Sequence, residues 1–143
     1  MILQILAVLS AGTFFGAALY VSLAEHPARL SCGTQLAVTQ WRPSYRRGAR
    51  MQAPLALAGS GAALWTWWLD RDLRWLTGGL LLLFLIPFTV IAILPTNKGL
   101  STIDVSSSEA EHLLRRWGQL HAVRSLLSGA AFIIFVTALA IAR

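Results

Sequence analysis

The chain has 143 residues, of which 56% are hydrophobic and only 13% are charged, and its formal net charge is +6. Soluble domains carry about 25% charged residues, so the composition argues against an ordinary soluble protein. The length favours a single domain. The single cysteine, Cys32, excludes an internal disulfide framework and a cysteine-based metal cluster. No nucleic-acid-binding motif accompanies the positive charge, so we attribute it to membrane topology and expect no nucleic-acid partner.

Long charge-free runs separate the charged stretches and cover residues 1–24, 51–69, 75–97 and 125–142. A helix crosses a bilayer with about 17–25 mainly apolar residues, and it satisfies all its own backbone hydrogen bonds in lipid. The sequence therefore predicts an all-α fold, a four-transmembrane-helix bundle that makes one domain over residues 1–143. The predicted spans are about 2–24, 51–69, 75–96 and 117–142, and no internal repeat is visible.

The Lys and Arg residues predict the orientation of these spans, because they favour short cytoplasmic loops. Most of them fall in residues 25–50 and 98–117, whereas the connection 70–74 holds two and the C-terminal end holds only Arg143. We therefore expect both termini on the outer side and two longer cytoplasmic loops. We expect the protein in the lipid bilayer of a bacterial cytoplasmic membrane.

Two local signals concern helix packing and helix ends. Gly12 and Gly16 form a small-xxx-small pair in the first span, which permits close helix approach. Such a pair serves packing within the chain or the seam of a homo-oligomer, and the sequence does not separate the two. Ser108 and Glu111 form a capping box, with Ser108 as the expected N-cap of the last helix.

Polar side chains gather at the predicted cytoplasmic ends of the spans. An ionisable group within a span costs roughly 2.5–3.5 kcal/mol, so Arg124 requires a partner, and Glu25 lies at matching depth. We predict a buried Glu25–Arg124 pair, with His121 beside it as a candidate general base. The alternative is a snorkelling Arg124 and a packing histidine. The full set is Glu25, His26, Asn97, Lys98, Trp117, His121 and Arg124.

A metal site is a further reading of the same residues. His26, His121 and Glu25 would make the two-histidine, one-carboxylate set of non-haem iron proteins. His26 and His121 would alternatively ligate haem. Neither His26 nor His121 belongs to an HxxxH or ExxH pair on its own helix, so we expect no cofactor and keep a metal or haem as the minority alternative.

Several short motifs follow one another in an order that resembles the DUF1772, or anthrone oxygenase-like, membrane protein family. The resemblance rests on the ordered set rather than on one diagnostic motif. It covers nearly the whole chain. The motifs are AGTFFGAALY at residues 11–20, EHPAR at 25–29, WRPSY at 41–45, RMQA at 50–53, IPFT at 86–89, PTNK at 95–98 and WGQLHAVR at 117–124.

The resemblance implies a four-helix membrane protein and an oxygenase-like activity, the monooxygenase reaction that converts a polyketide anthrone to an anthraquinone with dioxygen. It also implies that no metal or flavin is needed. The expected partners are a hydrophobic aromatic molecule, dioxygen and the bilayer. An anthrone has an acidic carbon between two aromatic rings, so a base generates an electron-rich anion that reduces dioxygen directly. The protein must supply the base, oxyanion donors and a dry aromatic slot.

We assign these roles to the polar cluster. The expected catalytic residues are His121 as base, Arg124 and Asn97 as oxyanion donors, and His26 beside them. Trp117, Trp41 and Tyr45 are expected to line the slot, and Glu25 to orient His26 or pair with Arg124. We also assign Arg29 and Lys98 to substrate binding.

The sequence leaves other functions open. A non-catalytic membrane protein would bind a lipid, a quinone or a partner subunit through the same cluster, with the Glu25–Arg124 pair as a staple. An enzyme needs a cavity that reaches His121, whereas a scaffold does not. A metal or haem protein would use His26 and His121 as ligands. The substrate, the oligomeric state and the protonation of both histidines stay open at this point.

Overall fold

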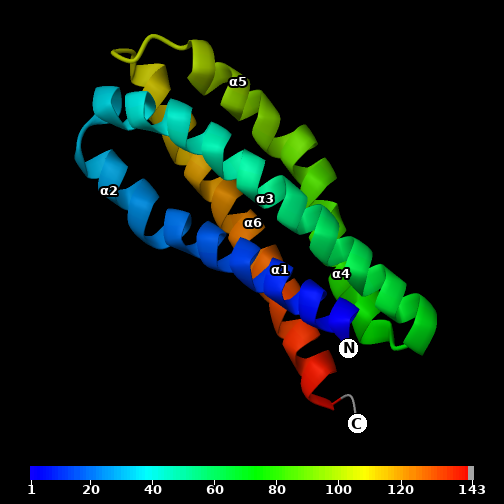
Figure 1. The fold of residues 1–143 in the computed structure, drawn as a ribbon. Coiled ribbons are helices and arrows are strands. Elements are labelled where there is room, and N and C mark those ends of the chain that lie inside the picture. The colour runs from blue at the N-terminus through cyan, green and yellow to red at the C-terminus, as the bar shows by residue number, and fades with distance from the viewer. Residues whose placement is uncertain (142–143) are drawn as a thin grey trace.

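The computed structural model describes residues 1–141, and the chain forms only helices and short connections within this range. The predicted all-α class is confirmed. The helices, in chain order, are α1 (Ile2–Tyr20), α2 (His26–Ser31), α3 (Thr34–Asp70), α4 (Leu73–Phe88), α5 (Leu94–Thr102) and α6 (Ser108–Ile141) (Figure 1). A π-helical turn, Val21–Glu25, joins α1 to α2, and a second, Thr89–Ile93, joins α4 to α5.

The long helices lie side by side, each against two neighbours. α1 packs on α3 and α6, and α4 packs on the same two helices (Figure 1). The core between them holds Phe14, Trp75, Leu82 and Phe135, all nearly or fully buried. Trp75 stacks on Phe135 with 5.5 Å between ring centroids, so large apolar side chains from α1, α4 and α6 meet along one axis.

The predicted glycine pair of the first span divides into two environments. A Cβ at Gly12 would lie 2.8 Å from the ring of Phe132, so Gly12 permits the close approach of α1 to α6. A Cβ at Gly16 would meet no other atom of the described chain within 4 Å. Gly12 therefore serves packing within the chain, and the homo-oligomer stays a prediction.

Three helical segments of the described chain are long and apolar enough to cross a membrane, as expected for an integral membrane protein. They are Ile2–Ser31, Leu73–Thr102 and Ser108–Ile141. The predicted spans 2–24 and 75–96 lie within the first two. The predicted span 117–142 lies within α6 except for residue 142, which is outside the described residues. The predicted span 51–69 lies within α3, which does not belong to this apolar set.

Both π-helical turns precede a proline, and the proline explains them. The N–H of His26 bonds to the carbonyl of Val21, five residues back, and Pro27 follows. The N–H of Leu94 bonds to the carbonyl of Thr89 in the same way, and Pro95 follows. A proline lacks the N–H and its ring crowds the carbonyl four residues back, so the helix widens by one residue before it.

The order of elements repeats, although the sequence shows no repeat. Residues 1–70 form a helix, a π-helical turn, a short proline-led helix and a long helix, and residues 73–141 form the same series. The contacts repeat too, because α1 packs on α3 as α4 packs on α6. The sequence therefore shows no internal repeat, as expected, whereas the order of the helices does repeat.

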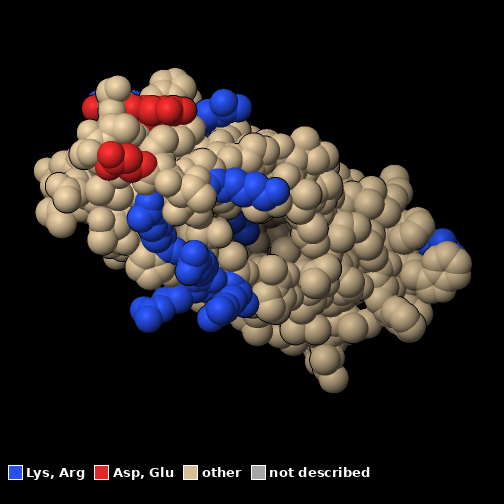
Figure 2. All heavy atoms as spheres, turned by 90° about the horizontal axis from the view of Figure 1, so that it is seen from above, with Lys and Arg blue, Asp and Glu red and all other residues tan. Residues whose placement is uncertain are grey.

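Charged side chains gather toward one end of the molecule, where α2, α5 and the start of α6 lie (Figures 1 and 2). The opposite end holds the connection between α3 and α4, where Asp72 caps α4 by accepting a hydrogen bond from the N–H of Arg74. At the start of α6 the hydroxyl of Ser107, rather than that of Ser108, accepts a hydrogen bond from the N–H of Ala110. The predicted cap at Ser108 is thus wrong by one residue.

Candidate functional site

A cavity of about 320 Å³ lies where the two π-helical turns face α3 and α6. α1 and its π-helical turn, the middle of α3, the second π-helical turn with the start of α5, and α6 each contribute to its wall. The polar or aromatic side chains that line it are Tyr20, Glu25, Ser44, Tyr45, Arg47, Gln52, Thr89, Asn97, Trp117, His121 and Arg124.

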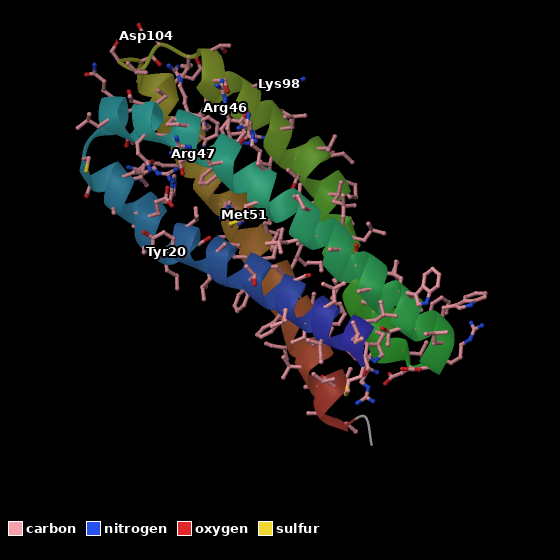
Figure 3. The ribbon with its side chains drawn as sticks, viewed as in Figure 1. Tyr20, Arg46, Arg47, Met51, Lys98 and Asp104 are labelled. Atoms are coloured by element: carbon pink, nitrogen blue, oxygen red, sulfur yellow. The ribbon has the colours of Figure 1, made fainter. Side chains whose placement is uncertain are left out.

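The mouth of the cavity lies between α1 and α3. The exposed lining residues are Tyr20 on α1 and Arg47, Ala49 and Met51 on α3; Tyr20 is 61% exposed and Met51 46%. Figure 3 shows where Tyr20, Arg47 and Met51 lie on the two helices. Tyr20 ends the apolar helix α1, and Arg47 carries a positive charge on the facing side of the mouth.

Stacked aromatic rings form one wall. The rings of Trp117 and His121, one turn apart on α6, stack with 4.8 Å between centroids and 27° between planes. Trp41 and Tyr45 on α3 stack in the same way, at 4.5 Å and 13°. The edge of Trp41 meets Trp117 at 5.9 Å, so the two pairs join into one aromatic cluster. Tyr45, Trp117 and His121 face the cavity.

His121 is buried and hydrogen-bonded on one side of its ring. Its Nδ1 lies 3.0 Å from the hydroxyl of Ser22, which belongs to the first π-helical turn. That hydroxyl lies 2.8 Å from the hydroxyl of Ser125, which also contacts the carbonyl of Ala18. The opposite ring nitrogen, Nε2, has no hydrogen-bond partner among residues 1–141. It is therefore the nitrogen available to a molecule in the cavity.

Two further polar groups at the cavity lack protein partners within the described chain. The buried Asn97 has no hydrogen bond to its Oδ1, and Arg124 has none to its Nε. The guanidinium of Arg124 instead lies 4.8 Å from the ring centroid of Phe14, as a cation–π contact. A buried polar group without a partner costs free energy, so a ligand that bonds to these atoms would be stabilised.

The predicted Glu25–Arg124 pair is wrong. Glu25 pairs with Arg29, one helical turn away, and accepts hydrogen bonds from Ser44 at 2.6 Å and from Gln40 at 3.1 Å. Arg29 is itself buried and also reaches Ser44. Because Arg29 and the hydroxyl of Ser44 bind the carboxylate of Glu25, Arg124 has no ion pair in the described structure.

Four predicted site residues do not line the cavity. His26 is buried behind Trp117, with 5.1 Å between their rings, and the guanidinium of Arg29 lies 5.7 Å from the same indole. Trp41 is fully buried behind Tyr45. Lys98 is exposed and points away from the bundle (Figure 3). The structure brings Glu25, Tyr45, Asn97, Trp117, His121 and Arg124 together at the cavity.

The alternative metal set does not assemble. No group of three His, Cys, Asp or Glu side chains with the geometry of a metal site occurs within residues 1–141. Glu25 is held by Arg29 and Ser44, and His121 by Ser22. The set of His26, His121 and Glu25 therefore lacks the convergence that a metal ion requires.

Sequence reasoning missed Ser22, Gln52 and Ser125. Gln52 is buried and lines the cavity, and its polarity within an otherwise apolar run was a usable signal. Ser22 and Ser125 are hydroxyls inside apolar helices, where serine also serves ordinary packing. Only the fold, which brings α1 and α6 together, reveals their contact with His121.

Comparison with known proteins identifies a family for this chain. The family model described as anthrone oxygenase matches residues 41–134, a stretch that holds most of the cavity wall. The curated anthrone oxygenase of Claviceps purpurea (strain 20.1) is 27% identical over 146 residues, which cover 90% of this chain and 84% of the relative. No solved structure matches the chain. The family match extends over more than half of the chain, and the chain therefore belongs to the anthrone oxygenase family.

Proposed function

We propose that this protein oxidises an anthrone-type hydrophobic aromatic with dioxygen inside the cavity between α1 and α3. The observation that carries the proposal is the convergence of His121, Asn97 and Arg124 on one aromatic-walled cavity. The name of the fungal relative supports the same reaction class. A volume of about 320 Å³ falls at the lower end of the range for small-molecule sites, as a flat tricyclic substrate requires.

His121 acts as the general base in this proposal. Its Nε2 accepts the proton from the carbon between the two aromatic rings, and the electron pair of that C–H bond enters the ring system as a phenolate. The anion passes one electron to dioxygen, the resulting radical and superoxide combine to form a C–O bond, and the peroxide anion takes back the proton from His121 as a hydroperoxide. Loss of water from the hydroperoxide breaks the O–O bond and leaves the carbonyl of the anthraquinone. One dioxygen is consumed, and one oxygen atom leaves as water.

Arg124 and Asn97 stabilise the negative charge. The guanidinium of Arg124 has no ion pair within the described residues, so an oxyanion in the cavity supplies its counter-charge. The Nδ2–H group of Asn97 donates a second hydrogen bond to this oxyanion, while the unpaired Oδ1 accepts one from a hydroxyl of the substrate. Donors that are fixed before the reaction act strongly in a site that excludes water. The stacked rings of Trp117 and His121 exclude water on that wall.

The oxygen-uptake experiment tests the reaction. Purified protein is mixed with a simple anthrone in detergent, and uptake is measured before and after metal chelation, beside His121→Ala. His112→Ala is the matched control, because His112 is exposed on the same helix and far from the cavity. We expect uptake that survives chelation, is unchanged in the control and falls at least 100-fold in His121→Ala. Uptake that depends on chelatable metal, or equal uptake in both variants, would contradict the proposal.

A non-catalytic binding role is the competing outcome of the same experiment. The cavity also has room for part of a quinone or a lipid chain, and Arg124 suits an anionic head group. If the protein binds an anthraquinone, as measured by quenching of tryptophan fluorescence, but takes up no oxygen with any anthrone, the binding role replaces the oxygenase.

We also propose that α3 crosses the membrane as a fourth span, with both termini outside. α3 packs against both α1 and α4 along the bundle, and its predicted span of residues 51–69 is free of charge. The exposed Cys32 between α2 and α3 is then cytoplasmic. A membrane-impermeant maleimide should label Cys32 only after cells are permeabilised, whereas Arg71→Cys in a Cys32→Ser background should react in intact cells. The reverse pattern would contradict this orientation. A bacterial cytoplasmic membrane stays a prediction.

A further inference from the structure

We propose that Ser22 and Ser125 are positioning residues, which hold His121 as its Nδ1–H tautomer and so leave Nε2 unprotonated toward the cavity. The proposal rests on the proposed function, in which Nε2 accepts the substrate proton. It concerns a chain of hydrogen bonds that joins α6 to α1, from the imidazole through two hydroxyls to a backbone carbonyl.

The distances define this chain. The Oγ of Ser22 lies 3.0 Å from Nδ1 of His121 and 2.8 Å from the Oγ of Ser125. The Oγ of Ser125 lies 3.1 Å from two carbonyl oxygens, those of Ala18 on α1 and of His121 itself. The two contacts of Ser22 lie within the usual hydrogen-bond range, and the two carbonyl contacts of Ser125, at 3.1 Å, lie at its long end. Ser125 is almost fully buried, so no bulk water competes for its hydroxyl.

The number of protons that each group can donate then decides in which direction these hydrogen bonds run. A serine hydroxyl donates one proton, and a carbonyl oxygen only accepts. Ser125 therefore gives its proton to a carbonyl, and the short contact between the hydroxyls requires Ser22 to donate to Ser125. With its one proton used, Ser22 must accept from His121. Nδ1 of the imidazole is thus the protonated nitrogen, and the neutral ring carries no second proton on Nε2.

The opposite direction satisfies fewer groups. If Ser125 donated to Ser22, and Ser22 to Nδ1, the hydroxyl of Ser125 would have no proton for either carbonyl. That arrangement makes two hydrogen bonds, whereas the proposed one makes three. It would also place a proton on Nε2, so the ring would meet the cavity as a donor and be unable to accept a proton from a substrate.

The first π-helical turn places Ser22 in this chain. Ser22 lies within Val21–Glu25, one turn after the carbonyl of Ala18 that receives the proton of Ser125. Single π-helical turns occur frequently at functional sites. Here the turn precedes Pro27, so the proline of α2 indirectly sets where the hydroxyl of Ser22 meets α6. The equivalent turn of the second half, Thr89–Ile93, has Thr89 bonded to its own helix at the carbonyl of Leu85.

Nitrogen-15 NMR of the histidine rings tests the tautomer without any substrate. The protein is labelled at histidine and studied in detergent micelles, with the His121 signals assigned by their loss in His121→Ala. We expect an unprotonated Nε2 and a protonated Nδ1 in the wild-type protein. Ser22→Ala removes the acceptor and should move the population to the Nε2–H tautomer. Ser22→Thr keeps the hydroxyl and should give the wild-type spectrum. Ser10 is a buried serine of α1 that takes no part in these hydrogen bonds, so Ser10→Ala should leave the spectrum unchanged.

Oxygen uptake supplies the second readout. Ser22→Ala should lower kcat about tenfold with KM unchanged, and Ser22→Thr should recover most of it. An Nε2–H tautomer in the wild-type protein, or a Ser22→Ala spectrum identical to that of the wild type, would overturn the proposal even if uptake is normal. An Nδ1–H tautomer that responds to Ser22→Ala in a protein without uptake would support the hydrogen-bond chain and overturn the oxygenase function instead.

Discussion

The two halves of the molecule share one architecture and differ in what their polar side chains do. Each half carries a stacked pair of rings one turn apart on its long helix, Trp41–Tyr45 on α3 and Trp117–His121 on α6. The pairs meet where Trp41 contacts Trp117. Both long helices therefore carry an aromatic pair one turn apart, and the second ring is a phenol on α3 and an imidazole on α6.

The charged groups of the two halves differ. In the first half, Glu25, Arg29 and Ser44 bind one another and tie α2 to α3, and the buried polar atoms that no described residue bonds belong to His26, Arg29 and Trp41, which lie outside the cavity. In the second half, Asn97 and Arg124 face the cavity with polar atoms that no described residue bonds. The unpaired polar atoms of the first half are thus buried away from the cavity, whereas those of the second half lie at its wall, where a ligand can reach them. We expect substitutions in the two halves to separate stability from activity accordingly.

The largest expected difference in kcat is between variants of His121 and of Tyr45. His121→Gln removes the base and should lower kcat for anthrone oxidation at least 100-fold, whereas Tyr45→Phe keeps the stacked ring and should change kcat less than about twofold. Steady-state oxygen uptake at several anthrone concentrations measures both. Comparable losses in the two variants would show that the rings act as a wall and that neither is a base.

The next largest difference is between a variant of Arg124, which should lose activity, and a variant of Glu25, which should lose stability. Arg124→Gln should reduce kcat by about 10–100-fold while thermal stability is unchanged or higher, because the variant removes an unpaired buried charge. Glu25→Gln should lower the free energy of unfolding by about 1–3 kcal/mol, because Arg29 loses its partner. Unfolding in detergent and oxygen uptake distinguish them. A stability loss in Arg124→Gln larger than in Glu25→Gln would reverse our assignment of the two charges.

The fold was largely predictable because length and apolarity determine where a helix can cross a membrane. The charge-free runs indicated every long helix, and three of them have the apolar length for a span. The π-helical turns were not predicted, although Pro27 and Pro95 stood at their ends in the sequence. A proline in a sequence usually indicates the end of a helix, whereas here the helix widens and continues beyond it.

The candidate site was predictable in its residue types and not in its pairings. The sequence indicated His121, Arg124, Asn97 and Trp117, because polar groups at the ends of spans must face one another or a cavity. It failed for Glu25, whose partner lies four residues along the same helix rather than across the bundle. The sequence indicates which charged residues lie at the same depth in the membrane. Which of them are in contact depends on the rotation of each helix about its axis, and the sequence does not give this rotation.

A smaller difference concerns Gly118 and Gly48, glycines of the two long helices. A Cβ at Gly118 would lie 2.6 Å from Nε2 of the buried His26, whereas a Cβ at Gly48 would meet no described atom within 4 Å. Gly118→Ala should therefore lower the free energy of unfolding by about 1–3 kcal/mol. Gly48→Ala should be neutral or raise it by up to about 1 kcal/mol, since alanine favours the helix. Thermal unfolding in detergent compares them, and equal midpoints would show that His26 moves aside freely.

The smallest expected effect on stability comes from the N-terminal cap of α4, which α1, the first helix of the other half, lacks. α1 begins after Met1 with no side-chain cap, whereas α4 begins with Asp72, whose carboxylate accepts hydrogen bonds from Arg74. The hydrogen bond from the Arg74 side chain holds the pKa of Asp72 below its ordinary value of 3.8. A lowered pKa in the folded state means that the carboxylate stabilises the fold above the unfolded-state pKa, and that this contribution is lost as the pH falls through the folded-state pKa.

Asp72→Ala should therefore lower the free energy of unfolding by about 1 kcal/mol at pH 7, and the gap between variant and wild type should narrow below about pH 4. Asp72→Asn is the control, because an asparagine still caps the helix and does not titrate. The gap between Asp72→Asn and Asp72→Ala should stay constant with pH, since the neutral cap depends on geometry alone. If the gap between wild type and Asp72→Ala stays equally constant down to pH 3, the charge of Asp72 contributes nothing, and the carboxyl group caps α4 through its hydrogen bond alone.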